Sequence, residues 1–290
     1  MYSTAKNPAG KLAQLPAGSG SSVNFTSTGT LGSGSTGASG CPPLMKAVAF
    51  NGGMNPAMFD TIAAADDWLT FSPSIPGGPA STHATNGFVP MMAFARDVNT
   101  AIDMVNSANP PEWMLTFNEP DFSYAGLTPT MSGTEAANAI APLIAAAKGK
   151  PTKFVAPVTA DPNSAFHEEF YAACGCRDFF SAYNIHQYNP SSANVINTIQ
   201  AYHGKWNDKP LWVTEVAPGG SGCTTSWDAA GQFMRDIYRF AKDSGFVDRV
   251  FWNTGNQIDG GDQNVCNSYL LDTGGSPSPL LDTYRAVDCS

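Results

Sequence analysis

Two glutamates occupy matching positions in the sequence, each at the end of an apolar run. Glu119 follows Trp113–Phe117, and Pro120 comes next, whose ring and missing N–H end a strand. Glu215 follows the apolar run Leu211–Thr214. Barrels of parallel strands carry their chemistry at the carboxyl ends of the strands. Two carboxylates placed in this way are the usual machinery of glycoside hydrolysis.

Polar and aromatic residues cluster at the same kind of position. Asn118 directly precedes Glu119. His186 and Tyr188 are two residues apart, so on an extended chain their side chains point the same way. Trp252 ends another apolar run. The spacing therefore predicts a site built from the ends of several strands.

The elements that position these residues alternate along the chain. Helix-like segments rich in alanine or with apolar residues at helical spacing are Asp97–Ser107, Gly133–Ala147 and Trp227–Ser244. Eight apolar runs of strand length are Met45–Phe50, Trp68–Phe71, Gly87–Met92, Trp113–Phe117, Lys153–Pro157, Phe179–His186, Leu211–Thr214 and Val250–Trp252. This alternation predicts an α/β fold, a (β/α)8 TIM barrel. A doubly wound open sheet is the alternative, but the turn at 51–54 lacks the dinucleotide-binding fingerprint.

The length and the composition divide the chain into two parts. A barrel of 250 residues is one domain, so we assign residues 41–290 to a single catalytic barrel. Residues 1–40 form a low-complexity extension, because 18 of the 24 residues at 17–40 are Gly, Ser or Thr. The start of the sequence has no apolar run of signal-peptide type, so we expect a processed form of a secreted protein.

The charge of the chain limits the classes of molecule that it can bind. The net charge is −9, and only 15 residues are Lys or Arg. No basic patch can form from so few cations, which argues against nucleic acid and anionic membranes as partners. A neutral polymer fits this composition, and we expect a monomer.

The six cysteines are compatible with three disulfides and an oxidising compartment. No metal-ligand spacing is present, and we expect neither a metal nor a cofactor. Loops that follow strands share one face of a barrel, and loops that precede strands share the other. The expected pairs are therefore Cys223–Cys266, Cys41–Cys289 and, in a tight ring, Cys174–Cys176. The histidines outside the motifs, His83, His167 and His203, are expected on the surface or in loops.

The motifs resemble those of the clan A glycosidases, whose two glutamates close strands four and seven. Within that clan the chain is similar, over roughly residues 42–286, to family 128 of the glycoside hydrolases, small fungal-type endo-β-1,3-glucanases. The segments that carry the resemblance are Phe117-Asn-Glu-Pro-Asp121, Trp212-Val-Thr-Glu-Val216, His186-x-Tyr188 and Ser268-Tyr-Leu-Leu-Asp272.

The resemblance implies the role of each site residue. Glu215 would be the nucleophile and Glu119 the acid/base of a retaining double displacement. Glu119 must then be protonated in the free enzyme, so we expect burial and the charge of Glu215 to raise its pKa. Tyr188 would orient Glu215, and Asn118 would bind the sugar 2-hydroxyl.

The aromatic and imidazole residues have roles of the same origin. Trp252 would stack under the sugar, because an indole covers the apolar face of a pyranose. His186 would belong to the active site.

Two other functions remain open at this stage. Specificity lies in the loops, so the same catalytic pair also fits a β-1,4-glucanase or a β-mannanase of the clan. A non-catalytic glucan-binding cell-wall protein is the third possibility. A degenerate binder would be expected to lose a catalytic carboxylate or Asn118, and this chain retains all three residues.

Overall fold

The computed structural model describes residues 44–51, 55–76, 80–123, 130–219, 225–257 and 267–287. Within these residues, seven parallel strands form one curved sheet in the order β2-β1-β7-β6-β5-β4-β3. The strands are β1 (Met45–Phe50), β2 (Asp67–Thr70), β3 (Trp113–Leu115), β4 (Lys153–Val155), β5 (Phe180–Tyr188), β6 (Leu211–Ala217) and β7 (Val247–Asn253). The predicted extension, residues 1–40, lies outside the described residues.

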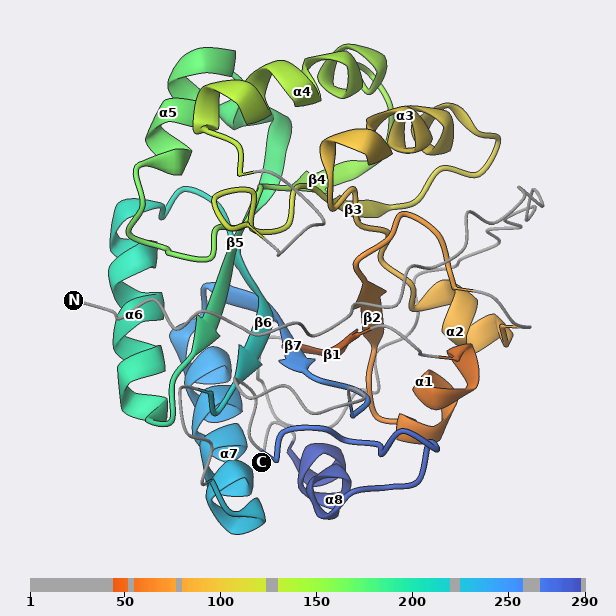
Figure 1. Ribbon diagram of the computed structural model, residues 1–290, viewed down its shortest axis with the longest axis vertical. Helices are drawn as coiled ribbons and strands as arrows, with labels where there is room; N and C mark the ends of the chain where they lie inside the picture. The colour runs from red at the N-terminus through yellow and green to blue at the C-terminus, as the bar shows by residue number, and fades with distance from the viewer. Residues whose placement is uncertain are drawn as a thin grey trace.

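Helices surround the sheet on its outer side (Figure 1). They are α1 (Pro56–Ile62), α2 (Thr82–Asn86), α3 (Val98–Asn106), α4 (Gly133–Ala146), α5 (Phe166–Cys174), α6 (Ser192–Lys205), α7 (Trp227–Ser244) and α8 (Pro279–Ala286), with short 3-10 turns at Ala95–Asp97 and Arg177–Phe179. Most begin at a residue whose side chain accepts a hydrogen bond from the first turn, namely Asn55, Ser81, Ser132, Ser191, Ser226 and Ser278. These N-caps satisfy backbone donors that the helix itself leaves unpaired.

The third predicted strand, Gly87–Met92, is present only as two isolated bridges. Phe88 pairs with Trp68 of β2, and Met91 pairs with Leu115 of β3. Pro90 lies between the two bridges and has no N–H to donate, so a continuous ladder cannot form here. The prediction of a regular strand is therefore wrong. The segment nevertheless lies between β2 and β3 and completes the barrel, so β3 occupies the fourth strand position and β6 the seventh.

Side chains alternate between two cores, as the period of a strand requires. Along β1, Ala47 and Ala49 face the barrel interior, whereas Val48 and Phe50 face the helices. The interrupted segment follows the same rule, since it contributes alternate residues to the interior. The interior core comprises Ala47, Ala49, Leu69, Val89, Met91, Ala93, Leu115, Val155, Ala182, Trp212 and Phe251. The predicted (β/α)8 architecture is thus confirmed, with one irregular strand position.

The expectations about cysteines and histidines have different outcomes. Cys174 and Cys176 form a disulfide at the end of α5. The other predicted pairs lie outside the described residues. His167 is not a surface residue: it is buried on α5, and its Nε2 lies 2.9 Å from the carbonyl oxygen of Pro157. Helix amphipathicity explains the difference, because this position of α5 faces the barrel.

No helix in the described part of the chain is long and apolar enough to cross a membrane.

Candidate active site

Glu119 lies at a sharp turn beyond β3, next to Asn118, which forms an isolated bridge with Val158. Its backbone N–H donates to the carbonyl of Val158 at 2.9 Å, and its own carbonyl accepts from the N–H of Phe122 at 3.0 Å. Its φ of 42° is in the left-handed region, which residues other than glycine rarely adopt. Strained backbone of this kind is concentrated at functional sites, where the surrounding structure maintains it. The turn projects Glu119 from the carboxyl end of the strand position, as predicted.

Glu215 lies within β6 rather than after it, next to an irregularity in the ladder. Ile185 pairs with Val213, but the next residue of β5, His186, pairs with Glu215, so Thr214 is an extra residue. Such a bulge re-aims side chains. Val213 and Val216 face the helices. Between them, Thr214 and Glu215 both lie on the His186 side, which a regular strand would forbid for consecutive residues.

His186 connects the two glutamates. Its Nδ1 lies 2.9 Å from Glu119 Oε1 and 3.4 Å from Glu215 Oε1. The imidazole is 1% exposed, while the carboxylate side chains are 12% and 9% exposed. Burial lowers the pKa of His186, but the charge of Glu215 and the hydrogen bond and charge of Glu119 outweigh it, so that its pKa is raised above 6.5. The predicted active-site position of His186 agrees with this geometry.

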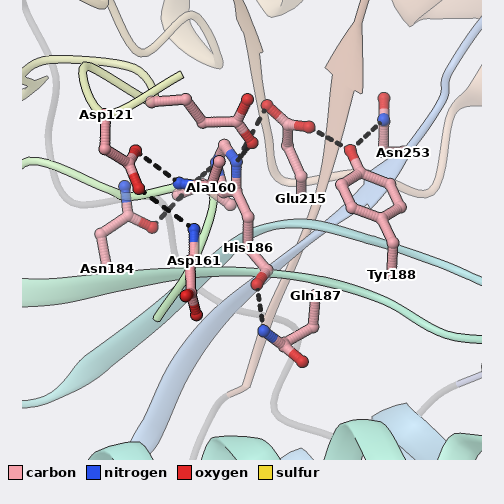
Figure 2. Close-up of polar contacts among 11 residues, drawn as sticks. Asp121, Ala160, Asp161, Asn184, His186, Gln187, Tyr188, Glu215 and Asn253 are labelled. Carbon is pink, nitrogen blue, oxygen red and sulfur yellow. Dashed lines mark hydrogen bonds and ion pairs between the residues drawn. The ribbon is translucent and has the colours of Figure 1, made fainter. Parts of the chain in front are cut away.

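A chain of hydrogen bonds also holds Glu215 from the other side. The hydroxyl of Tyr188 donates to Glu215 Oε2 and accepts from Nδ2 of Asn253 (Figure 2). Asn253 Oδ1 in turn accepts from Asn51 Nδ2 at 3.0 Å. Tyr188 therefore contacts Glu215 as predicted, and Asn51 and Asn253 fix the orientation of its hydroxyl.

Asn118 and Asp121 flank Glu119. Asn118 is buried, and its backbone N–H donates to Ala93 O at 3.1 Å. Asp121 accepts from the backbone N–H groups of Ala160 and Asp161, at 2.8 and 3.2 Å. Burial raises the pKa of Asp121, and its backbone hydrogen bonds oppose that shift. Asp121 thus ties the Glu119 turn to the loop after β4.

Trp252 does not lie where the sequence predicted. Its side chain is fully buried, its ring packs against Phe233 of α7, and its indole N–H donates to Ser268 O at 2.6 Å. Alternation along β7 explains this, because Phe251 and Asn253 point into the barrel and Trp252 points toward the helices. Neither face of the indole is available to a sugar, so the predicted stacking role is wrong.

Four polar residues of the site were not predicted from the sequence: Asn51, Asn184, Thr214 and Asn253. Asn184 had a usable signal, because it precedes His186 by two residues and shares its face of β5. Asn253 follows the inward-pointing Phe251 by the same interval. Thr214 had none, because only the bulge turns it inward.

The donor atoms of Glu119, His186 and Glu215 lie within 4.8 Å of one another. Two carboxylates and an imidazole are a set that a divalent transition metal accepts. Here His186 Nδ1 is within hydrogen-bonding distance of both carboxylates, so the same atoms can instead share protons. What the arrangement can do by itself is nucleophilic attack by one carboxylate and proton transfer by the other.

Comparison with known proteins identifies the family and the fold of the chain. Residues 57–284 match the glycosyl hydrolase catalytic core family. No curated protein sequence matches the chain. Among solved structures, a subgroup II GH128 endo-β-1,3-glucanase from Sorangium cellulosum is similar, with a TM-score of 0.69, 23% identity, and coverage of 84% of this chain and 98% of that one.

Two further structures of the same fold differ in their mode of action. A subgroup I GH128 endo-β-1,3-glucanase from Amycolatopsis mediterranei, in complex with laminaripentaose, has a TM-score of 0.67 and 20% identity, covering 85% of this chain and 100% of that one. A subgroup V GH128 exo-β-1,3-glucanase from Cryptococcus neoformans has a TM-score of 0.67 and 17% identity, covering 84% and 98%.

The fold and the paired carboxylates define a glycoside hydrolase. The chain belongs to the glycosyl hydrolase catalytic core family, and its fold is that of the GH128 enzymes. The predicted class of glycoside hydrolase is thereby confirmed, and the resemblance to family 128 is confirmed for the fold.

Proposed function

We propose that the protein is a secreted, retaining endo-β-1,3-glucanase in which Glu215 is the nucleophile and Glu119 the acid/base. The observation that carries the proposal is the proximity of the two carboxylates: one oxygen of each lies within 4.8 Å of the other. Retaining enzymes have carboxyls about 5–5.5 Å apart, whereas inverting enzymes need about 6.5–9.5 Å to admit water between them. The spacing therefore supports double displacement.

Each half of the reaction uses groups already in place. Glu215 attacks the anomeric carbon as Glu119 gives a proton to the departing glycosidic oxygen, and a glycosyl ester of Glu215 results. Glu119 then takes a proton from water, whose oxygen attacks the same carbon and releases Glu215. Asn118 is proposed to bind the sugar 2-hydroxyl, an interaction that strengthens in the transition state.

The substrate class rests on the structural relatives. Neighbours with this fold act on β-1,3-glucans, and one was crystallised with laminaripentaose. A chain with 13% charged residues and a net charge of −9 is compatible with a neutral polysaccharide. We propose endo cleavage, although the neighbours include exo enzymes, and we propose secretion from the even number of cysteines.

Another clan A β-glycanase remains the alternative that the catalytic pair alone does not separate. A panel of soluble β-1,3-, β-1,4- and β-1,6-glucans and β-mannan separates them. Endo cleavage predicts a rapid fall in viscosity and a ladder of oligosaccharides, whereas exo cleavage releases one small product. Hydrolysis of only a β-1,4-linked polymer would overturn the proposed specificity.

The roles of the two glutamates are tested with alanine variants and azide. Glu215→Ala should lose activity on every substrate by about 10⁴-fold or more, because no nucleophile remains. Glu119→Ala should lose about 10²–10⁴-fold on polysaccharide. It should still form the glycosyl-enzyme from an aryl β-glucoside, whose leaving group needs little protonation.

Azide distinguishes the two variants by stereochemistry. In Glu119→Ala it replaces the activated water and gives a sugar azide of retained configuration. In Glu215→Ala it enters the vacated space and gives the inverted azide. The matched control is Glu112→Ala, since that side chain is 67% exposed and, within the described residues, forms its one ion pair with Lys153 at the surface. Opposite products would reverse the roles, and near-normal activity in both variants would reject the site.

A further inference from the structure

A line of buried polar groups extends from Glu119 into the barrel wall. His186 Nδ1 lies 2.9 Å from Glu119 Oε1, and His186 Nε2 lies 3.0 Å from the hydroxyl of Thr214. That hydroxyl donates to Asn184 Oδ1 at 2.5 Å. Asn184 and Thr214 are fully buried and His186 is nearly so, which shields the whole line from water. Low local dielectric strengthens such hydrogen bonds and makes an unpaired partner costly.

The number of hydrogens on each group decides which atom donates and which accepts along this line of hydrogen bonds. A threonine hydroxyl has one hydrogen, and Thr214 donates it to Asn184. Toward His186 the Thr214 oxygen can therefore only accept. Nε2 of His186 must carry a hydrogen, and Nδ1 is left to face Glu119 and Glu215.

We propose that Thr214 and Asn184 are positioning residues that keep a proton on Nε2 of His186, so that Nδ1 and Glu119 share the acid/base proton. The inference rests on the proposed function for the role of Glu119. It adds that the proton donated to the leaving sugar belongs to the Glu119–His186 pair. When Nδ1 carries it, Glu119 is a carboxylate; when Glu119 carries it, Nδ1 accepts.

The proton count balances through both half-reactions. As the bond from the anomeric carbon to the glycosidic oxygen breaks, the shared proton moves to that oxygen. The Glu119–His186 pair thereby loses one proton. Nε2 keeps its hydrogen, which Thr214 accepts. In the second half-reaction the attacking water returns one proton to the pair as its oxygen bonds to the anomeric carbon. No other proton carrier is needed.

The charges around the imidazole explain why this arrangement holds the shared proton. Glu119 after β3, Glu215 on β6 and Asp121 in the Glu119 turn all favour positive charge on His186. If the shared proton leaves while Nε2 stays protonated, the Nδ1 lone pair faces two carboxylates. Without Thr214 the imidazole can instead move its remaining proton to Nδ1, which stabilises the deprotonated state.

The direct test is the tautomer of His186 in the resting enzyme. Long-range ¹H–¹⁵N correlation spectra of the full chain with ¹⁵N-labelled histidine resolve four imidazoles, and His186→Gln assigns the relevant one. We expect Nε2 to remain protonated over the whole pH range and only Nδ1 to titrate. A spectrum in which Nδ1 keeps the proton and Nε2 loses it would overturn the inference, because Thr214 would then be the donor.

Variants of Thr214 connect the tautomer to catalysis. Thr214→Val removes the hydroxyl at nearly constant volume, and Thr214→Ser is the matched control that keeps it. In the valine variant the basic limb of the kcat/KM profile should move to lower pH by about one unit. A shift of that size corresponds to the free energy of about one hydrogen bond. The serine variant should keep the wild-type limb.

An unmoved limb in Thr214→Val would refute the positioning role, whatever its effect on kcat. If Thr214→Val does not fold, Asn184→Ala supplies the same comparison, since it removes the acceptor that orients Thr214. The tautomer measurement needs no activity, so it separates the two proposals. An inactive enzyme with Nε2 protonated would reject the proposed function, and an active one with Nε2 deprotonated would reject only this inference.

Discussion

Removal of the Tyr188 hydroxyl tests how Glu215, the proposed nucleophile, is held and stabilised. That hydroxyl donates to Glu215 Oε2, and Nδ2 of Asn253 donates to it at 2.5 Å. In the proposed mechanism Glu215 is a neutral ester in the glycosyl-enzyme, and it regains its charge as that intermediate is hydrolysed. A donor fixed beside Glu215 stabilises the charge that develops in this second step. Tyr188→Phe should therefore slow the breakdown of the intermediate more than its formation.

The size of the effect follows from the type of hydrogen bond. A hydrogen bond to a charged group contributes about 1.5–3 kcal/mol, which corresponds to roughly 10–150-fold in rate. Asn253→Ala removes only the group that orients the hydroxyl. A neutral hydrogen bond contributes about 0.5–1.5 kcal/mol, so the expected loss is about 2–12-fold.

The assay is pre-steady-state release of the phenol from an activated aryl β-1,3-glucoside. Tyr188→Phe should show a burst equal to the enzyme concentration, followed by slow turnover, with kcat and KM lowered together as the intermediate accumulates. The double variant with Asn253→Ala should be no slower than Tyr188→Phe alone, because Asn253 acts through the hydroxyl. Losses that multiply, or slowed burst formation with normal steady-state turnover, would refute this account of Tyr188.

Two further predictions concern the surface and the helix layer. Phe122 is 50% exposed and lies three residues after Glu119, so we expect its ring to bind polysaccharide. Phe122→Ala should raise KM for long β-1,3-glucan about tenfold without changing the free energy of unfolding. An unchanged KM would exclude a role of Phe122 in binding. Burial lowers the pKa of His167, so below pH 6.5 the unfolded chain binds a proton that the folded protein does not. The contribution of His167 to the free energy of unfolding is therefore complete above pH 6.5 and is lost as the pH falls, by about 1.4 kcal/mol per pH unit. In urea titrations at several pH values, His167→Gln should lack this part of the slope. Equal slopes for His167→Gln and the wild type would contradict that sign.

Most of the fold could be predicted because apolar runs and helical periodicity are local signals. The predicted helix Trp227–Ser244 has the same bounds as α7, since Ser226 caps its start and Gly245 ends it in the left-handed conformation. Glu119 could be placed from the apolar run before it together with Pro120. The failures came from positions where two local rules conflict, as in the segment 87–92, whose apolar alternation is that of a strand while Pro90 interrupts its ladder.

The orientation of side chains was harder to predict than the position of strands. The stacking role of Trp252 was predicted from its place at the end of an apolar run and from the family resemblance, yet its neighbour Asn253 has the inward position. His167 was assigned to the surface because a lone histidine gives no sign of burial. In both cases the sequence shows which residues share a face of the strand or helix. Which of the two faces points into the barrel depends on how the element packs in the fold, and the sequence does not show that.

The bulge in β6 is the feature that makes this site possible and that the sequence could not reveal. In a regular strand, Thr214 and Glu215 would point to opposite faces, and only one could approach the barrel interior. With Thr214 as the extra residue, both lie beside His186, so one imidazole contacts Glu215, Glu119 and the hydroxyl of Thr214. The motif Trp212-Val-Thr-Glu-Val216 thus contributes two adjacent side chains to the candidate site. A change that restored regular pairing of β5 and β6 would separate them without altering either residue.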